Sequence, residues 1–147
     1  MKTLEEAKSY LEEITDELVT IREMDNLEMY RMLTDIGKKM EELPEEKKTP
    51  ENFVYGCVSM VYIAHGFDEE GAIHYRCSSE SHIVRGYLAI LIEALSGLPP
   101  ADVANETKGM VEAFARDTDL KATLTPNRAN AFGNIYQLMV DKAKAAA

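Results

Sequence analysis

Cysteine is scarce in this 147-residue chain, which has only Cys57 and Cys77. Their spacing matches neither a Cys-x-x-Cys redox pair nor a four-ligand zinc site. The three histidines also lack the spacing of metal ligands, so we expect no metal site. Because structural disulfides are uncommon in a reducing cytoplasm, we expect both cysteines to be free thiols.

Long apolar runs are missing as well. No stretch approaches the roughly 20 apolar residues that a membrane-spanning helix needs. The first residues, MKTLEEAKSYLEEI, also lack the apolar core of a signal peptide. We therefore expect a soluble cytoplasmic protein with no membrane partner.

Basic residues are outnumbered: 16 Lys and Arg face 26 Asp and Glu, so the formal net charge is −10. This balance opposes binding to nucleic-acid phosphates, which requires clustered basic residues. It suits a protein partner with a basic face. The chain also has no glycine-rich nucleotide-binding motif, so we expect no nucleotide cofactor.

Apolar residues recur at alternating spacings of three and four from Leu4 to Ile21. This pattern predicts an amphipathic helix at about 3–24. A second helix is predicted after Asp25, which can cap it, and it ends before Pro44.

The pattern then changes to β-branched and aromatic residues in FVYGCVSMVYIAHGF, which predicts strand structure. Together with AIHYR and a short strand before Gly56, this segment predicts a three-stranded antiparallel meander. Helical patterns return in SSESHIVRGYLAILIEALSG, where Ser78 or Ser79 can cap the helix and Gly97 can stop it. The predicted fold is one α+β domain over 1–147, with the sheet packed against helices in two layers.

Cys57 lies beside Gly56 at the first predicted turn of the meander. A buried cysteine usually packs as a small apolar residue, and we expect this role for Cys77. For Cys57 a second interpretation is reactivity, because Gly56 leaves room for a partner's backbone and turns display functional groups. A reactive thiol needs a nearby cation or helix N-terminus to lower its pKa. Arg128, near the start of the last predicted helix, is either that cation or an ordinary surface arginine.

The residues around Cys57 resemble a known family. ELPEEKKTPENFVYGCVSMVYI is similar to the signature of the SufE-like sulfur acceptors, also called the Fe–S metabolism-associated domain. That signature has a Leu-Pro in an acidic loop, a Thr-Pro or Ser-Pro, an Asn, and then Gly-Cys-x-Ser-x-Val-aromatic. Downstream, SSESHIVRGYLAIL and LTPNRANAFGNI resemble two further motifs of the family, in the same order.

The resemblance implies a SufE/NifU-like fold and a role in sulfur transfer. The protein would take persulfide sulfur from a pyridoxal-phosphate-dependent cysteine desulfurase onto Cys57 and stimulate that enzyme. It would then deliver the sulfur to an iron–sulfur cluster scaffold, with no cofactor of its own. Gly56, Ser59 and Arg128 would form the loop or the surroundings of the thiol. The helix at about 3–24 would be an addition to the family domain.

Two other functions remain open from the sequence. One is a protein-interaction module on the same fold that does not need Cys57. The other is a thiol enzyme or redox sensor that pairs Cys57 with a histidine close to it in space. The sequence leaves open whether the protein is a monomer or a homodimer.

Overall fold

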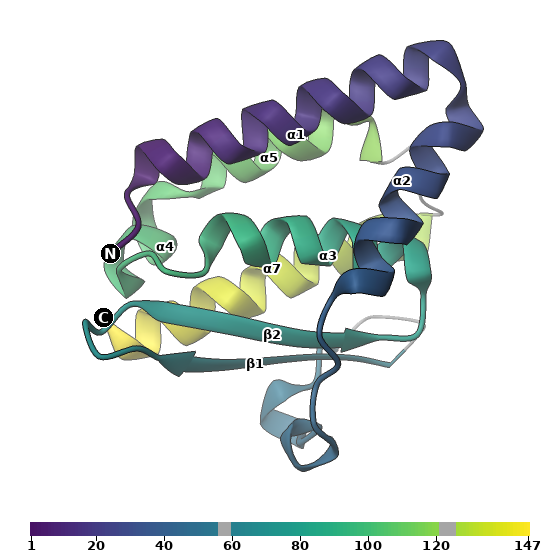
Figure 1. Ribbon diagram of the computed structural model, residues 1–147. Helices are drawn as coiled ribbons and strands as arrows, with labels where there is room; N and C mark the ends of the chain where they lie inside the picture. The colour runs from purple at the N-terminus through teal and green to yellow at the C-terminus, as the bar shows by residue number, and fades with distance from the viewer. Residues whose placement is uncertain (56–59, 121–125) are drawn as a thin grey trace.

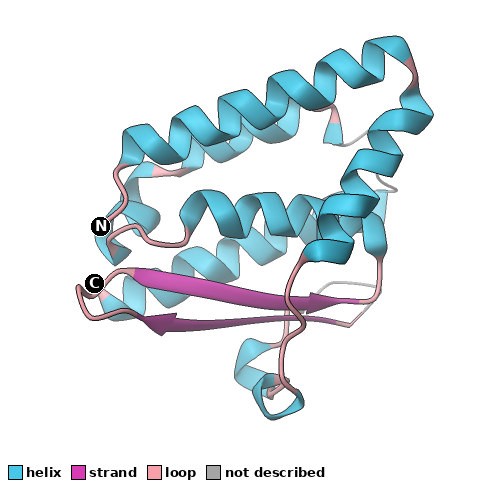
Figure 2. Ribbon diagram, in the orientation of Figure 1, coloured by secondary structure: helices cyan, strands magenta, loops and turns pink. Residues whose placement is uncertain are grey.

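The computed structural model describes residues 1–55, 60–120 and 126–147, without the side chains of residues 126–128. Figures 1 and 2 show a two-stranded sheet with helices gathered on one of its faces. In chain order the described elements are α1 (Leu4–Met24), α2 (Asn26–Lys39), the 3-10 turns η1 (Glu45–Lys47) and η2 (Pro50–Asn52), β1 (Val61–Phe67), β2 (Ile73–Ser79), α3 (His82–Leu95), α4 (Pro100–Glu106), α5 (Lys108–Asp117) and α7 (Pro126–Ala146). Within these ranges, no helix combines the length and apolarity that crossing a membrane requires.

The helices begin where local capping favours them. Thr3 and Glu6 form a capping box at the start of α1, in which each side chain accepts a hydrogen bond from the other residue's backbone N–H. Asp25 ends α1 and caps α2, since its carboxylate accepts a hydrogen bond from the N–H of Leu27. The predicted break at Asp25 thus has a local cause.

β1 and β2 form an antiparallel hairpin with Val61 opposite Ser79 and Phe67 opposite Ile73. The turn between them is stabilised by Asp68, whose carboxylate accepts hydrogen bonds from two backbone N–H groups. Gly71, with φ 85°, supplies the left-handed conformation that the turn requires.

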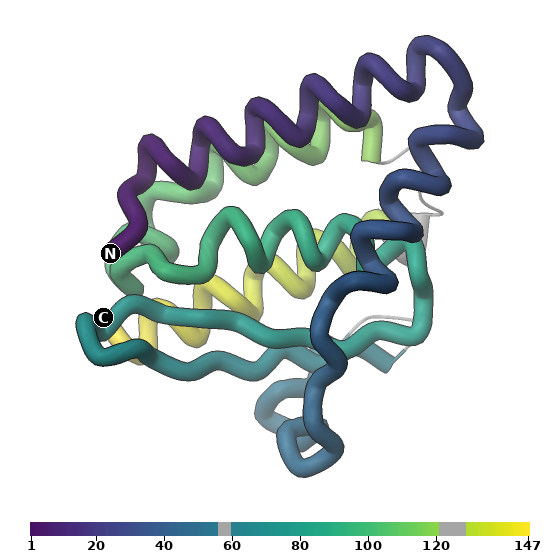
Figure 3. Tube along the Cα trace, viewed as in Figure 1, coloured from purple at the N-terminus to yellow at the C-terminus, as the bar shows by residue number. Residues whose placement is uncertain are grey.

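The α+β class is confirmed, but in the described ranges the sheet has two strands and not three. Where the third strand was predicted, Phe53 pairs with Tyr62 as an isolated bridge, and Val54 donates one hydrogen bond to Val61. The physical reason is that η2 turns the chain until Asn52, which leaves only the following residues to extend along β1. Figure 3 follows the chain through these turns into β1.

The helices stack two deep on the sheet. Figure 1 shows α3 and α7 next to the strands, with α1 and α5 on their far side. Tyr87, Leu88, Ile90 and Leu91 of α3 are all fully buried, because this helix contacts neighbours all round. One core cluster joins residues from α1, α2, both strands, α3, α4, α5 and α7.

Arg85, in the most apolar helix, does have the partners that such a residue needs. Its guanidinium donates to the carbonyl oxygens of Gly37 at 3.2 Å and Met40 at 3.3 Å, at the C-terminal end of α2. It also forms an ion pair with Glu42 at 3.0 Å. The cation therefore binds carbonyl groups in the last turn of α2, where the carbonyl oxygen of Gly37 also accepts the N–H of Met40 at 3.3 Å.

Candidate functional site

The residues predicted for the site are only partly described. Gly56, Cys57 and Ser59 lie outside the described residues. Arg128 falls in the first turn of α7, but its side chain is outside the description too. The structure therefore gives the frame around Cys57, and the proposed contacts of Cys57 stay predictions.

Two buried valines anchor the chain on either side of Cys57. The N–H of Val54 donates to the carbonyl oxygen of Val61 at 2.9 Å, and the two side chains are 2% and 0% exposed. Val54 and its neighbour on β1, Val61, are thus both fixed in the core. Cys57 belongs to the short segment between these anchors.

Large apolar side chains flank this segment at the surface. Tyr55 is 70% exposed and Met60 is 52% exposed. The Phe53 ring lies edge-on to Tyr55 at 4.9 Å and to Tyr62 at 5.4 Å between ring centroids. We call these three rings, of Phe53, Tyr55 and Tyr62, the aromatic patch. Phe53 and Tyr62 are themselves half-buried, so the exposed apolar surface here comes from Tyr55 and Met60. Exposed apolar groups can mark surfaces that bind another protein.

A polar link connects the base of this segment to the last helix. Lys142 of α7 donates to Oδ1 of Asn52 at 2.7 Å, and the Asn52 amide donates to the carbonyl oxygen of Lys47 at 2.8 Å. Asn52 is 8% exposed. Burial lowers the pKa of Lys142, and the negative charge of Glu51 opposes this effect. Sequence reasoning missed Lys142, since a lysine in an amphipathic helix gives no signal of its own.

Cys77 is a buried packing residue. Its thiol is 0% exposed and lies 3.2 Å from the sulfur of Met40. Burial raises the pKa of the thiol from its ordinary 9.0 to about 12, and the positive charge of Arg85 opposes the shift only in part. The thiol is therefore neutral at physiological pH and a poor nucleophile.

We predict that ionisation of Cys77 makes the protein less stable at high pH. Since the folded pKa lies above the unfolded value, the stabilising effect is complete below about pH 9 and is lost as pH rises towards 12. The slope reaches up to about 1.4 kcal/mol per pH unit. Urea unfolding of the wild type and of Cys77→Ala between pH 8 and 11 measures it. Equal pH slopes for the two proteins would contradict this prediction.

The histidines are scattered in the structure as they are in the sequence. His65 lies on β1, His74 pairs with Asp68 at 2.9 Å, and His82 is exposed at the start of α3. The described residues contain no group of three His, Cys, Asp or Glu that could hold a metal ion. Burial lowers the pKa of His65, with a smaller contribution from Lys142.

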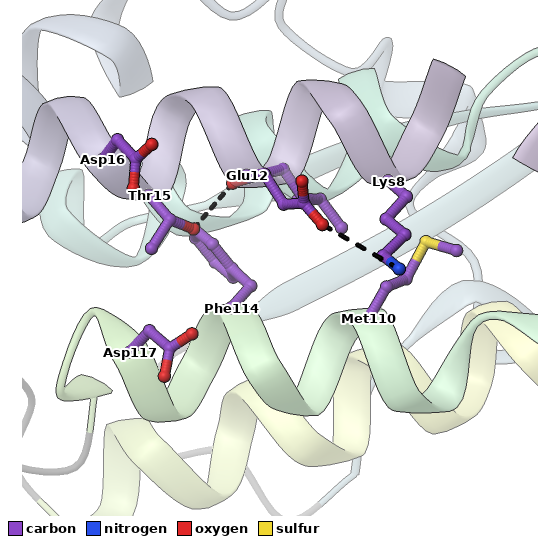
Figure 4. A pocket seen from close by; sticks show the side chains of 8 residues that line it. Lys8, Glu12, Thr15, Asp16, Met110, Phe114 and Asp117 are labelled. Carbon is purple, nitrogen blue, oxygen red and sulfur yellow. Dashed lines mark hydrogen bonds and ion pairs between the residues drawn. The ribbon is translucent and has the colours of Figure 1, made fainter. Parts of the chain in front are cut away.

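Two hollows are lined by described residues other than Val54, Tyr55, Met60 and Val61. The smaller, of about 110 Å³, lies between α1 and α5 over Thr15 and Phe114 (Figure 4). Its Thr15 hydroxyl is already bonded to the Leu11 carbonyl oxygen. The larger, of about 1120 Å³, runs between α5 and α7 beside Phe132 and Tyr136. The described residues that line the two hollows include no cysteine or histidine, so neither offers a nucleophile of that kind.

The fold is shared with a solved structure, the solution structure of a hypothetical protein from Thermus thermophilus. The TM-score is 0.70 at 15% sequence identity, and the match covers 93% of this chain and 95% of the other. At this identity the likeness shows the fold alone.

The family is established by sequence. The model of the SufE family, described as an Fe-S metabolism associated domain, matches residues 12–143. The chain therefore belongs to the SufE family. The match begins inside α1, so residues 4–11 of this helix precede it.

Curated relatives agree with this assignment. An uncharacterized SufE-like protein of Synechocystis sp. is 41% identical over 122 residues, which is 83% of this chain and 74% of the relative. The sulfur acceptor protein CsdE of Escherichia coli is 29% identical over 115 residues, covering 78% of this chain and 76% of CsdE. SufE-like protein 1 of Arabidopsis thaliana, chloroplastic/mitochondrial, is 34% identical over 97% of this chain, which spans 37% of that protein.

Proposed function

We propose that this protein accepts sulfur from the persulfide of a cysteine desulfurase onto Cys57 and passes it on for iron–sulfur cluster assembly. The observation that carries the proposal is the SufE family match over residues 12–143, a range that includes Cys57. The relative named as a sulfur acceptor, CsdE, supports the same chemistry.

The proposed step is an exchange at sulfur. The Cys57 thiolate attacks the outer sulfur of the donor persulfide, and a new S–S bond forms as the donor's S–S bond breaks. The electron pair leaves with the donor cysteine, whose thiolate then takes a proton. The transfer consumes no oxidant or reductant. The acceptor needs no cofactor, because the pyridoxal phosphate of the desulfurase has already broken the C–S bond.

The frame around Cys57 suits this role. The anchors Val54 and Val61 fix both ends of the segment in the core, so the thiol can be presented without unfolding the sheet. The aromatic patch and Met60 offer apolar surface to a partner on both sides of the segment. Arg128, in the first turn of α7, is the cation that we propose to favour the thiolate, with Gly56 and Ser59 shaping its surroundings.

Further parts of the proposal concern partners and organisation. We propose that the protein also stimulates its desulfurase and that an iron–sulfur scaffold receives the sulfur. We propose that residues 1–147 act as a single domain in the cytoplasm, with the amphipathic helix at about 3–24 as an addition at the N-terminal end.

The proposal predicts a covalent adduct. After incubation with a cysteine desulfurase of the same cell and cysteine, intact-protein mass spectrometry should show the gain of one sulfur atom. A thiol reductant should remove it, since a persulfide is reducible. Omission of cysteine is the control. A chain that gains no sulfur from any desulfurase of that cell would contradict the proposal.

A further inference from the structure

The link between Lys142 and Asn52 joins two parts of the chain that the proposed chemistry depends on. Asn52 ends η2, directly before the residues that pair with β1 and lead to Cys57. Lys142 lies on α7, the helix whose first turn carries Arg128. The single hydrogen bond of 2.7 Å between their side chains thus connects the base of the Cys57 segment to the helix of the proposed cation.

A packing role alone does not explain why a lysine occupies position 142, because burial of its ammonium group costs free energy. Burial disfavours the ammonium form of Lys142, as the lowered pKa shows. Its charged surroundings are Glu51, which favours the ammonium, and His65, whose own pKa Lys142 helps to lower. An apolar side chain of similar length would pack the same stem without this desolvation. What the ammonium adds is a directed bond to Asn52.

Asn52 is itself held in place by further hydrogen bonds. Its amide donates to the carbonyl oxygen of Lys47, and its backbone N–H donates to the carbonyl oxygen of Thr49. Asn52 is 8% exposed, so these bonds are sheltered from water. The side chain therefore has a fixed position, and its Oδ1 fixes where Lys142 must lie.

Lys142 is connected to the first turn of α7 by the continuous helix between them. Arg128 precedes Lys142 by 14 positions, a distance of ~21 Å along a continuous helix. The turns of α7 are rigidly bonded, and near Lys142 its Met139 is fully buried, with a carbonyl oxygen that accepts a hydrogen bond from the Tyr75 hydroxyl at 2.8 Å. The helix therefore stays in place when the link is broken, and loss of the bond to Asn52 releases the end of η2 from α7.

We propose that Lys142 and Asn52 are a positioning pair for sulfur transfer, which holds the end of η2, from which the chain leads to Cys57, to α7. In this role, neither residue contacts the transferred sulfur. The inference rests on the proposed function, since it assigns the pair a part in that reaction. The pair is expected to affect the rate of transfer within the docked complex. Displacement of reacting groups by about 1 Å can lower such a rate by up to ~10²-fold.

The test measures persulfide transfer from a cysteine desulfurase to the full-length protein as a function of its concentration. Lys142→Met keeps the stem and removes the donor, and Asn52→Ala removes the acceptor but keeps the cation. Lys142→Arg restores a cation that can donate to Asn52. Lys144→Met is the matched control, because it removes an exposed charge from the same helix.

We expect Lys142→Met and Asn52→Ala each to lower the maximal rate by about 10-fold, with the half-saturating concentration unchanged. The double variant should be no slower than either single variant, since the two residues form one link. Lys142→Arg should recover most of the rate, and Lys144→Met should match the wild type. A merely destabilised variant would behave differently, because an unfolded fraction raises the half-saturating concentration and leaves the maximal rate per folded molecule unchanged.

Three results would overturn the inference while leaving the proposed function intact. They are a maximal rate for Lys142→Met equal to that of the wild type, a loss confined to the half-saturating concentration, and an equal loss in Lys144→Met. Failure of the wild type itself to accept sulfur would be a distinct result, and it would overturn the proposed function together with the inference.

Discussion

Replacement of Cys57 by serine is expected to abolish persulfide acceptance, with a fall in rate on the order of 10³-fold or more. The reason is chemical: a serine hydroxyl is not ionised at neutral pH and cannot form the S–S bond to the transferred sulfur. The fold should be retained, because the anchors Val54 and Val61 hold the segment from its two ends. The measurement is the rate of sulfur transfer from a cysteine desulfurase, with circular dichroism to verify folding.

The second cysteine is the matched control for this experiment. Cys77→Ala should accept sulfur at a rate within about twofold of the wild type, because the Cys77 thiol is fully buried and its pKa is raised to about 12. Full function of Cys57→Ser in cells would instead favour an interaction module that does not use the thiol. Oxidation of Cys57 by small oxidants without any protein partner would favour a redox sensor.

The largest stability effect is expected for Gly86→Ala, at the crossing of α2 and α3. A Cβ atom at Gly86 would overlap the carbonyl oxygen of Leu33 and would lie 2.7 Å from its carbonyl carbon. These are backbone atoms of a packed helix, so the two helices would have to separate. Overpacking costs typically about 1–3 kcal/mol, and we expect a loss of about 3 kcal/mol or more in the free energy of unfolding, measured by urea denaturation.

Gly133→Ala is the control for this substitution. Gly133 is also a helical glycine, but a Cβ atom there meets nothing within 4 Å. Since alanine is the better helix former, this variant should be more stable by about 0.5–1 kcal/mol. A Gly86→Ala variant as stable as the wild type would show that the contact between α2 and α3 is not as close as described.

Elements with a strong local signal could be predicted from the sequence. The apolar period from Leu4 and the capping residue Asp25 predict two helices that the structure contains. Gly97, expected to stop a helix, has φ 95°, which is a conformation that glycine adopts most readily.

Elements set by long-range contacts could not be predicted as well. The sequence predicts Ser78 or Ser79 as the cap of α3, but both residues belong to β2, and Ser81 is the cap. The hairpin pairing with β1 extends the strand past the point where its local pattern ends. The glycine crossing of α2 and α3 and the partners of Arg85 also depend on packing between distant segments.

The residues of the candidate site also differ in whether a local sequence signal identifies them. Cys57 could be singled out because a Gly-Cys pair at a predicted turn stands within a family signature. Lys142 could not, since its role follows only from the approach of α7 to Asn52, 90 residues away in sequence. Gly56, Ser59 and Arg128 remain predictions about the surroundings of the thiol.

The central claim is that Cys57 carries the sulfur, and the most direct test is to locate it. The protein is loaded by a cysteine desulfurase and cysteine, its thiols and persulfides are trapped with an alkylating agent, and the digested peptides are weighed by mass spectrometry. The account predicts an additional sulfur atom on the peptide that contains Cys57 and none on the peptide that contains Cys77. An additional sulfur on Cys77, or on neither peptide, would contradict it.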